Sequence, residues 1–253
     1  MAQIIPLSEG SYTIDATKEF IPFDITTDHL QQRNRGSLLV EIQPFLLITD
    51  KDYLLLDTGL GFSTPQGNWQ LHQNLMNHGI DPSSVTKVLM SHLHKDHTGG
   101  ISFKNEKTGE RELGFPDAVY YVNKDEMKYA LAHDGKSYVS EEFSLLKEAK
   151  NVIFTGNEGT IDGYIDYRVT GGHCPYHQAF WIRDENKTYF FGGDVAPQLS
   201  QMKNRFIAKY DYDGRRSMEL RQQYAEQGTK EKWTFLFYHD IKTPFLQLST
   251  LRK

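Results

Sequence analysis

A cluster of three histidines and one aspartate, placed directly after an apolar run, restricts what this chain can fold into more than any other feature. The run at 86–90 (TKVLM) predicts a short strand, and it leads into the hexapeptide HLHKDH. In an extended segment, residues two apart project to the same side, so His92 and His94 can reach one metal ion. Asp96 and His97 follow where the chain turns and can face a second ion. The alternative, a polar loop of solvated imidazoles, is disfavoured by so many ligand-type side chains within six residues.

Three further ligand-type side chains end apolar runs elsewhere in the sequence. His173 follows the predicted strand 164–170 and two glycines, which allow the backbone to approach an ion closely. Asp194 ends YFFGGD, where a buried carboxylate without a partner would be costly. His239 ends WTFLFYH in the same way. A single histidine at a strand end is more often a hydrogen-bonded structural residue, but together with the first cluster these three are predicted metal ligands.

Other polar residues near these runs have weaker assignments. Asp57 ends YLLLD and is either a turn or helix-capping residue, or a carboxylate that holds the far nitrogen of a ligand histidine. His177, four residues after His173, is expected to support a ligand in the same way. Asp240 has no evident role. Cys174 is interpreted as a small packing residue, and as the sole cysteine it excludes an intramolecular disulfide.

The remaining pattern predicts a single α/β domain over residues 1–253, with two sheets packed inside helical layers. The segment 102–115 is interpreted as a loop or hairpin insertion. The predicted strands and helices are strands at 37–48, 52–56, 86–90, 118–122, 151–155, 164–170, 178–183, 188–192 and 233–238, and helices at 68–78, 123–132 and 214–227.

Charge and composition limit the partners of the chain. A formal net charge of -5 argues against broad affinity for nucleic acid, and no apolar run is long enough to span a bilayer. The first residues lack the basic and apolar regions of a secretion signal, so we expect a soluble cytoplasmic protein. The expected partner is a small-molecule substrate, without nucleic acid or membrane, and a homodimer is left open.

The ordered motif resembles the metallo-β-lactamase superfamily over roughly residues 37–240. The resemblance rests on His-x-His-x-Asp-His at 92–97, followed by His173, Asp194 and His239, with Asp-Thr-Gly at 57–59 upstream. It implies an αββα four-layer sandwich with a two-metal site at one edge of the sheets. It also implies the following ligands: His92, His94 and His173 for the first ion, Asp96, His97 and His239 for the second, and Asp194 between them.

Within this superfamily, chain length and ligand set are similar to the N-acyl homoserine lactonases and related organophosphate-type hydrolases. Those lactonases place a tyrosine three residues after the bridging aspartate, where this chain has Pro197. Tyr238 or Tyr176 would then have to take its place. Alternatives on the same fold are a phosphodiester or organophosphate hydrolase, a persulfide dioxygenase with one iron, and a binding module without catalysis.

The predicted function is hydrolysis of a small ester, lactone or related acyl compound by a hydroxide shared between two divalent ions. The ligand atoms are nitrogen and oxygen, which suits zinc and also Mn²⁺ or Fe²⁺. A carboxylate, Asp96 or Asp194, is expected to relay the proton to the leaving group. Substrate contacts are expected from loops 24–36, 60–68 and 197–212. In the last loop, the residues that can anchor an anionic group are Lys203, Arg205, Lys209, Tyr210 and Tyr212.

Overall fold

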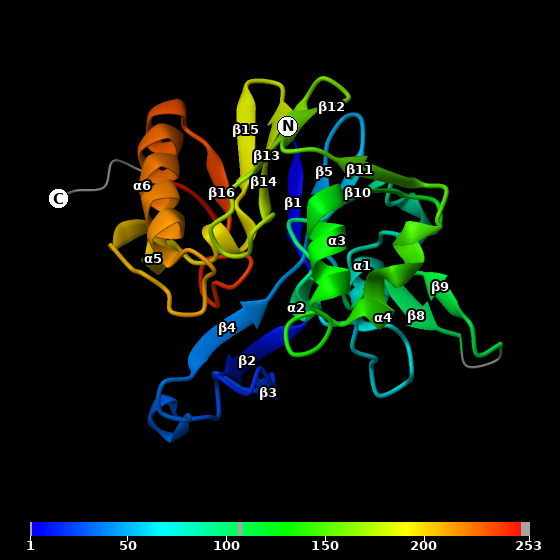
Figure 1. Cartoon of the computed structure of the whole chain (residues 1–253), viewed down its shortest axis with the longest axis horizontal. Helices are drawn as coiled ribbons and strands as arrows, with labels where there is room; N and C mark the ends of the chain where they lie inside the picture. Colours follow the sequence, from blue (N-terminus) through cyan, green and yellow to red (C-terminus); the bar gives the residue numbers. More distant parts are fainter. Residues whose placement is uncertain (1, 106–107, 249–253) are drawn as a thin grey trace.

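Two six-stranded sheets face each other at the centre of the molecule, with helices on both outer sides (Figure 1). The computed structural model describes residues 2–105 and 108–248. The first sheet has the order β1–β5–β6–β7–β10–β11, built from β1 (Gln3–Pro6), β5 (Phe45–Ile48), β6 (Tyr53–Leu56), β7 (Lys87–Leu89), β10 (Val119–Asn123) and β11 (Val152–Thr155). The second has the order β12–β13–β14–β15–β16–β17, built from β12 (Glu158–Ile161), β13 (Ile165–Val169), β14 (Gln178–Asp184), β15 (Lys187–Phe191), β16 (Thr234–Leu236) and β17 (Phe245–Gln247).

Helices cover the outer face of each sheet. Those beside the first sheet are α1 (Gln70–Asn77), α2 (Lys95–Thr98), α3 (Lys124–Ala132) and α4 (Ser140–Phe143), and those beside the second are α5 (Leu199–Lys203) and α6 (Gly214–Glu231). Short 3-10 turns lie at Leu30–Gln32, Pro82–Ser84, Ser144–Lys147 and Gly193–Val195. The described residues contain no helix with the length and apolar character needed to cross a bilayer.

Three apolar layers separate these elements, and alternation along the strands creates them. In β6, Leu54 and Leu56 point into the layer between the two sheets, whereas Leu55 packs against the outer helices. In β15, Phe191 faces the layer between the sheets and Phe190 faces α6. All five side chains are fully buried. Strands buried on both faces read as continuous apolar runs, which is how these two segments read in the sequence. The predicted αββα sandwich is therefore confirmed.

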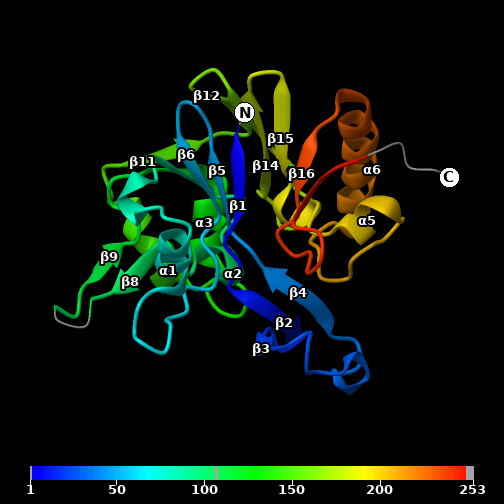
Figure 2. The same ribbon diagram turned by 180° about the vertical axis from the view of Figure 1, so that it is seen from behind.

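Two smaller sheets lie outside the sandwich. One has the order β3–β2–β4 and contains β3 (Ile21–Pro22), β2 (Gly10–Ile14) and β4 (Leu38–Ile42). The reverse view in Figure 2 shows this sheet extending from the lower edge of the sandwich. The other is a hairpin of β8 (Ser102–Lys104) and β9 (Arg111–Leu113), which agrees with the hairpin insertion predicted at 102–115.

The strand predicted at 37–48 was wrong in one respect, because it divides into β4 and β5, which belong to different sheets. Pro44 lies between them and has no amide proton for a sheet ladder. The sequence prediction also missed the short strands β1, β2, β3, β12 and β17, and it ended the last long helix at 227 rather than at Glu231.

Candidate functional residues follow strands whose carboxyl ends meet at one edge of the sandwich. Strands β6, β7 and β10 are mutually parallel, as are β15 and β16. Asp57 directly follows β6, and His92 lies shortly after β7. Asp194 and His239 follow β15 and β16 in the same way. The topology therefore delivers side chains from distant parts of the sequence to one place.

Candidate metal centre

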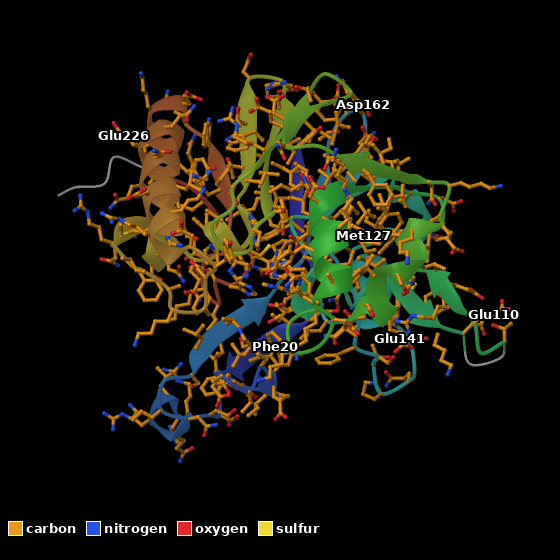
Figure 3. The ribbon with its side chains drawn as sticks, in the orientation of Figure 1. Phe20, Glu110, Met127, Glu141, Asp162 and Glu226 are labelled. Atoms are coloured by element: carbon orange, nitrogen blue, oxygen red, sulfur yellow. The ribbon has the colours of Figure 1, made fainter. Side chains whose placement is uncertain are left out.

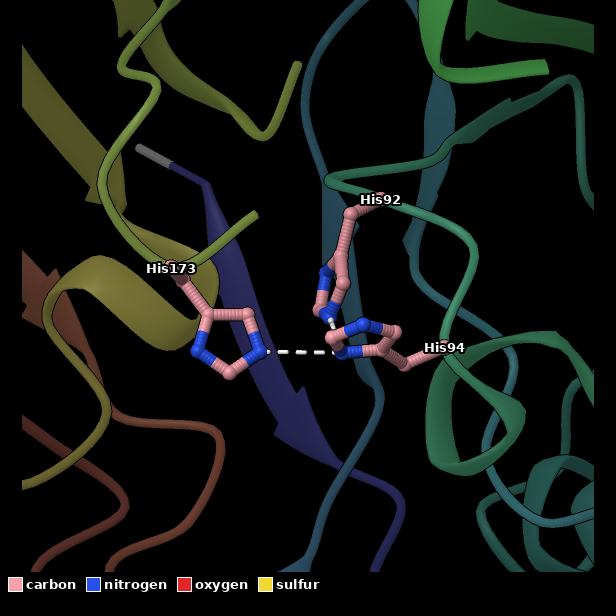
Figure 4. Close-up of side chains that lie close together, drawn as sticks. All are labelled: His92, His94 and His173. Atoms are coloured by element: carbon pink, nitrogen blue, oxygen red, sulfur yellow. Dashed lines mark hydrogen bonds between the residues drawn. The ribbon is translucent and has the colours of Figure 1, made fainter. Parts of the chain in front are cut away.

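Three histidines bring their ring nitrogens together at the first position of the centre (Figure 4). The distance from His92 Nε2 to His94 Nδ1 is 3.0 Å, and from His173 Nε2 to His94 Nδ1 it is 2.9 Å. His92 and His94 come from the segment after β7, whereas His173 comes from the loop between β13 and β14. The three nitrogens lie within 4.8 Å of one another, which is the arrangement of a metal-binding triad.

A second group lies beside the first and contains Asp96, His97 and His239. Asp96 Oδ2 is 3.7 Å from His97 Nε2 and 3.6 Å from His239 Nε2. Asp96 and His97 belong to α2, and His239 follows β16 in the other sheet. One potential ligand atom from each of these three residues lies within 4.8 Å of the other two.

Asp194 lies between the two groups and faces both. Its Oδ2 is 3.2 Å from His173 Nε2 in the first group. Its Oδ1 is 3.2 Å from His97 Nε2 and 3.0 Å from His239 Nε2 in the second. The backbone amide of Asp194 donates to His177 Nε2 at 3.1 Å, so His177 orients this carboxylate instead of joining either group.

Hydrogen bonds at the far nitrogens orient the rings of the first group. His173 Nδ1 donates to Asp211 Oδ1 at 2.8 Å. His92 Nδ1 lies 3.0 Å from Ser91 Oγ, and that hydroxyl donates to Asp57 at 2.6 Å. Both contacts place the proton on Nδ1 and leave Nε2 with a free lone pair. Asp211 was missed by the sequence prediction.

In the second group, the orienting partners are a carboxylate and a backbone carbonyl. Asp57, buried completely, accepts from His97 Nδ1 at 2.7 Å and from the amide of Ser91 at 2.6 Å. His239 Nδ1 donates to the carbonyl of Glu41 at 2.8 Å. Of the two interpretations of Asp57, the geometry agrees with the carboxylate that fixes a histidine ring.

The electrostatics of the centre are those of a site that requires positive charge. Burial raises the pKa of Asp194, but the imidazoles of His239, His173 and His97 outweigh it and hold that pKa well below its usual value. Burial opposes the charged form of His97, yet the carboxylates of Asp194, Asp96 and Asp57 raise its pKa well above the usual value. Without cations, protons on these rings must balance the carboxylates.

The same centre keeps two other rings neutral. Burial lowers the pKa of His92 and His94 well below the usual value, with the neighbouring imidazoles adding to the effect. The positive charge of Lys18 contributes to the lowered pKa of His94. Neutral imidazole is the form that binds metal ions.

Two buried atoms provide a direct test of whether cations fit. His97 Nε2 and Asp194 Oδ1 make no well-aligned hydrogen bond in the part of the chain that the structure describes, although the two atoms lie 3.2 Å apart. Buried polar atoms normally have partners, and an unpaired one is costly. Both atoms face the space between the second group and Asp194. An all-nitrogen-and-oxygen donor set around such atoms suits a divalent cation.

A buried carboxylate behind the first group ties its segments together. Glu126 of α3 accepts from the amide of Leu93 at 3.2 Å and from the hydroxyl of Tyr138 at 3.2 Å. The thiol of Cys174 lies 3.3 Å from the same carboxylate. Cys174 is thus a buried contact of this network, next to His173 in sequence.

A cavity of about 890 Å³ opens onto both groups. Its wall includes the ligand-type side chains His94, Asp96, His173, Asp194 and His239. It also includes residues from the β2–β3 loop, from the segment after α3 and from the segment after α5. Figure 3 labels Phe20, which belongs to the first of these segments and lies beside the small sheet.

Several predicted contacts with the substrate lie elsewhere. No residue of the loop 60–68 lines the cavity, and only Gly36 of the loop 24–36 does. Lys209, Tyr210 and Tyr212 line it, whereas Lys203 and Arg205 do not.

The two tyrosines considered as replacements at Pro197 are also outside the cavity wall. Tyr238 is fully buried behind the second group, where its hydroxyl donates to the carbonyl of Asp96 at 2.6 Å and its ring stacks on His97. Tyr176 packs instead against Tyr129. Asp240, for which the sequence indicated no role, accepts from the amide of Leu199 at the start of α5.

The fold and the motif define a protein family. The model of the metallo-beta-lactamase superfamily matches residues 40–239, and the chain belongs to this superfamily. Among curated relatives, the N-acyl homoserine lactonase AttM of Agrobacterium fabrum is 30% identical over 173 residues, covering 64% of this chain and 60% of the relative. AttM of Azorhizobium caulinodans is 29% identical over 183 residues, covering 61% of this chain and 64% of the relative. The alignments thus span less than two thirds of the length of these lactonases.

Solved structures confirm the fold. A probable metal-dependent hydrolase from Staphylococcus aureus has a TM-score of 0.79 at 20% identity, with 98% of this chain and 92% of that chain covered. AidC, a dizinc quorum-quenching lactonase, has a TM-score of 0.71 at 16% identity, with 98% and 91% covered.

Proposed function

We propose that this chain is a metal-dependent hydrolase that cleaves a small ester, lactone or related acyl compound with the help of two divalent cations. The observation that carries the proposal is the position of Asp194, whose two oxygens face two separate groups of imidazole nitrogens. The first ion would be held by His92, His94 and His173, the second by Asp96, His97 and His239, and Asp194 would be shared. These donors suit zinc, and also Mn²⁺ and Fe²⁺.

The cations and the side chains of the centre would have different roles in the reaction. When bound, two such ions supply a nucleophilic water at neutral pH and neutralise the charge that develops on the substrate oxygen. Asp96 lines the cavity, so its carboxylate would be placed to accept a proton from the attacking water and return it to the leaving group. Asp194 also lines the cavity and is the other candidate for this transfer.

The relatives support an acyl substrate. The curated relatives named above are N-acyl homoserine lactonases, and a further relative, thioesterase pkgB of Emericella nidulans, is 26% identical over 147 residues. Esters, lactones and thioesters share an electrophilic carbonyl, so one centre can act on all three. The ligand geometry itself does not depend on which of them is the substrate.

Metal analysis followed by a substrate panel tests the proposal. We expect about two ions per chain after loading with zinc, and turnover of lactones, thioesters or aryl esters in preference to phosphodiesters. A protein that holds less than one ion per chain after loading and hydrolyses none of these compounds would refute it. Iron as the sole metal, with oxygen consumed in the presence of glutathione persulfide, would instead indicate dioxygenase chemistry.

The Asp194→Ala variant tests the shared carboxylate. We expect kcat/KM to fall on the order of 10³-fold or more and bound metal to fall below two ions per chain, because both groups lose a ligand. Asp117→Ala, at an exposed carboxylate outside the cavity wall, is the matched control and should keep both properties. Full metal content and activity in Asp194→Ala would contradict the assignment.

A further inference from the structure

The cavity wall gathers positive charge that the centre itself does not use. Four lysines from four separate segments line it: Lys18, Lys95, Lys136 and Lys209. In the described part of the chain, none of these lysines has a carboxylate oxygen within 4 Å of its ammonium group. Unpaired cations in a hollow surface raise the local concentration of anions.

Lys18 is the most constrained of the four. It is half-buried, and its φ of 63° lies in the left-handed region, which is strained for a residue with a Cβ atom. Its turn is fixed by Asp15, whose Oδ1 accepts from the amide and the hydroxyl of Thr17 at 2.9 and 2.7 Å. The other oxygen of Asp15 accepts from Asn34, so this carboxylate, three residues before Lys18, is already occupied by other donors.

Lys95, which belongs to α2, lies against the same loop. Its ammonium is 5.7 Å from the centre of the Phe20 ring, two residues beyond Lys18. Lys95 sits between His94 and Asp96 in sequence and lines the cavity with both. The acidic residues of the cavity wall other than Asp15 are Asp96, Asp194 and Asp211, and all three face histidine nitrogens of the centre.

Apolar side chains form much of the remaining wall. They include Ile14, Phe20, Leu38, Val40, Phe206 and Ile207. Phe206 and Ile207 are 38% and 55% exposed and are adjacent in sequence in this wall. The cavity therefore offers an apolar surface for a carbon chain and unpaired ammonium groups for an anion, next to the centre.

We propose that the substrate is an acyl compound with an apolar body and an anionic group, and that Lys18, together with Lys95, binds that group. This inference rests on the proposed hydrolase function and adds the class of substrate to it. The anionic group is a carboxylate, sulfate or phosphate, since each is an oxyanion that an ammonium group binds. Lys136 and Lys209, which are exposed, add to the positive field at the mouth of the cavity.

Two esters that differ only at the far end of the acyl chain, where one has a methyl group and the other a carboxylate, test the inference. We would compare 4-nitrophenyl hexanoate with the 4-nitrophenyl half-ester of hexanedioic acid, using zinc-loaded full-length protein at low ionic strength. We expect kcat/KM to be at least about 10-fold higher for the charged ester, mainly through KM, with the advantage shrinking as salt is added. Hexanoate, hexyl sulfate and hexyl phosphate as competing inhibitors would show which oxyanion binds best.

Variants at Lys18 separate binding from folding. Lys18→Gln should lower the ratio of kcat/KM for the charged ester to kcat/KM for the neutral ester at least about 5-fold, whereas Lys18→Arg should retain the ratio. Lys203→Gln is the matched control, because Lys203 is exposed and outside the cavity wall. Thermal unfolding of each variant checks that the fold is intact.

Failure of the inference and failure of the proposed function give different results. If both esters are hydrolysed with equal kcat/KM, or Lys18→Gln lowers both equally, the anionic substrate class is wrong and the hydrolase proposal stands. If the zinc-loaded protein hydrolyses neither ester nor any carbonyl compound of the panel, both proposals fall.

Discussion

The two groups of the candidate centre are oriented by different parts of the molecule. In the first group, His173 is held by Asp211, which belongs to the segment after α5 and lines the cavity. In the second, His97 is held by Asp57, which is fully buried where β6 ends. His173 of the first group thus depends on a loop of the cavity wall, whereas His97 of the second group, like His92 through Ser91, depends on the interior of the sandwich. Substrate binding should affect the first group more.

Replacing the buried partner should have the largest effect. In Asp57→Asn, the amide cannot accept from the Ser91 amide, the Ser91 hydroxyl and His97 as the carboxylate does, so we expect affinity for the second ion to fall about 100-fold. Unfolding free energy of the metal-free protein should fall by about 2 kcal/mol. Chelator competition and urea unfolding measure the two quantities. A loss of affinity confined to the first ion would contradict the conclusion that Asp57 supports the second group.

The corresponding substitution at Asp211 should have a smaller effect on metal affinity and on stability. Asp211→Asn should weaken the first ion about 10-fold and change the unfolding free energy by less than about 1 kcal/mol, because its side chain makes one hydrogen bond to the centre. We also expect KM to change more than in Asp57→Asn, since Asp211 lines the cavity. Equal losses of stability in both variants would show that the two partners are equivalent.

A buried carboxylate beside the second group should affect the pH dependence of stability. Glu9 accepts from the amide of Leu60, in the loop that packs on Gly99 just after α2 of the second group. Burial raises the pKa of Glu9 to about 7 from 4.5. The folded chain therefore binds this proton more tightly than the unfolded chain, and the associated stability is complete below pH 4.5 and lost as pH rises through about 7.

The Glu9→Gln variant should flatten that dependence. We expect the fall in unfolding free energy between pH 5 and pH 8 to shrink by about 1 to 3 kcal/mol. Urea unfolding of metal-free protein at several pH values measures it. Glu142, whose pKa burial also raises to about 7, retains its own contribution in both proteins and serves as an internal reference. An unchanged pH profile would mean that Glu9 does not titrate in this window.

The sequence was sufficient to predict the sandwich and to predict that the ligand-type residues lie together. The segment that begins at His92 follows an apolar strand with parallel neighbours, and Asp194 and His239 follow two apolar strands that are parallel to each other, so the pattern predicts that these residues meet at one edge. His173 follows β13, a partly buried strand with antiparallel neighbours. The ligand roles of these residues remain predictions. The sandwich also followed from continuous apolar runs such as Tyr53–Leu56, which a sheet buried on both faces requires.

Other features left little trace in the sequence. Asp211 reaches His173 across 38 residues from an irregular segment, so no spacing rule points to it. Lys18 belongs to a loop between two short strands of the small sheet, and its contact with the cavity depends on how that sheet docks. The break between β4 and β5 had a signal, Pro44, that the apolar run around it concealed.

The three-stranded sheet has a consequence for how selectivity can evolve. Its β2–β3 loop and β4 supply part of the cavity wall, yet the sheet stands outside the sandwich that holds the centre (Figure 2). Exchanging the β2–β3 loop between relatives should therefore change the preference for one substrate over another without changing the residues of the candidate metal centre. The β2–β3 loop is therefore the first segment to exchange in an attempt to change substrate preference.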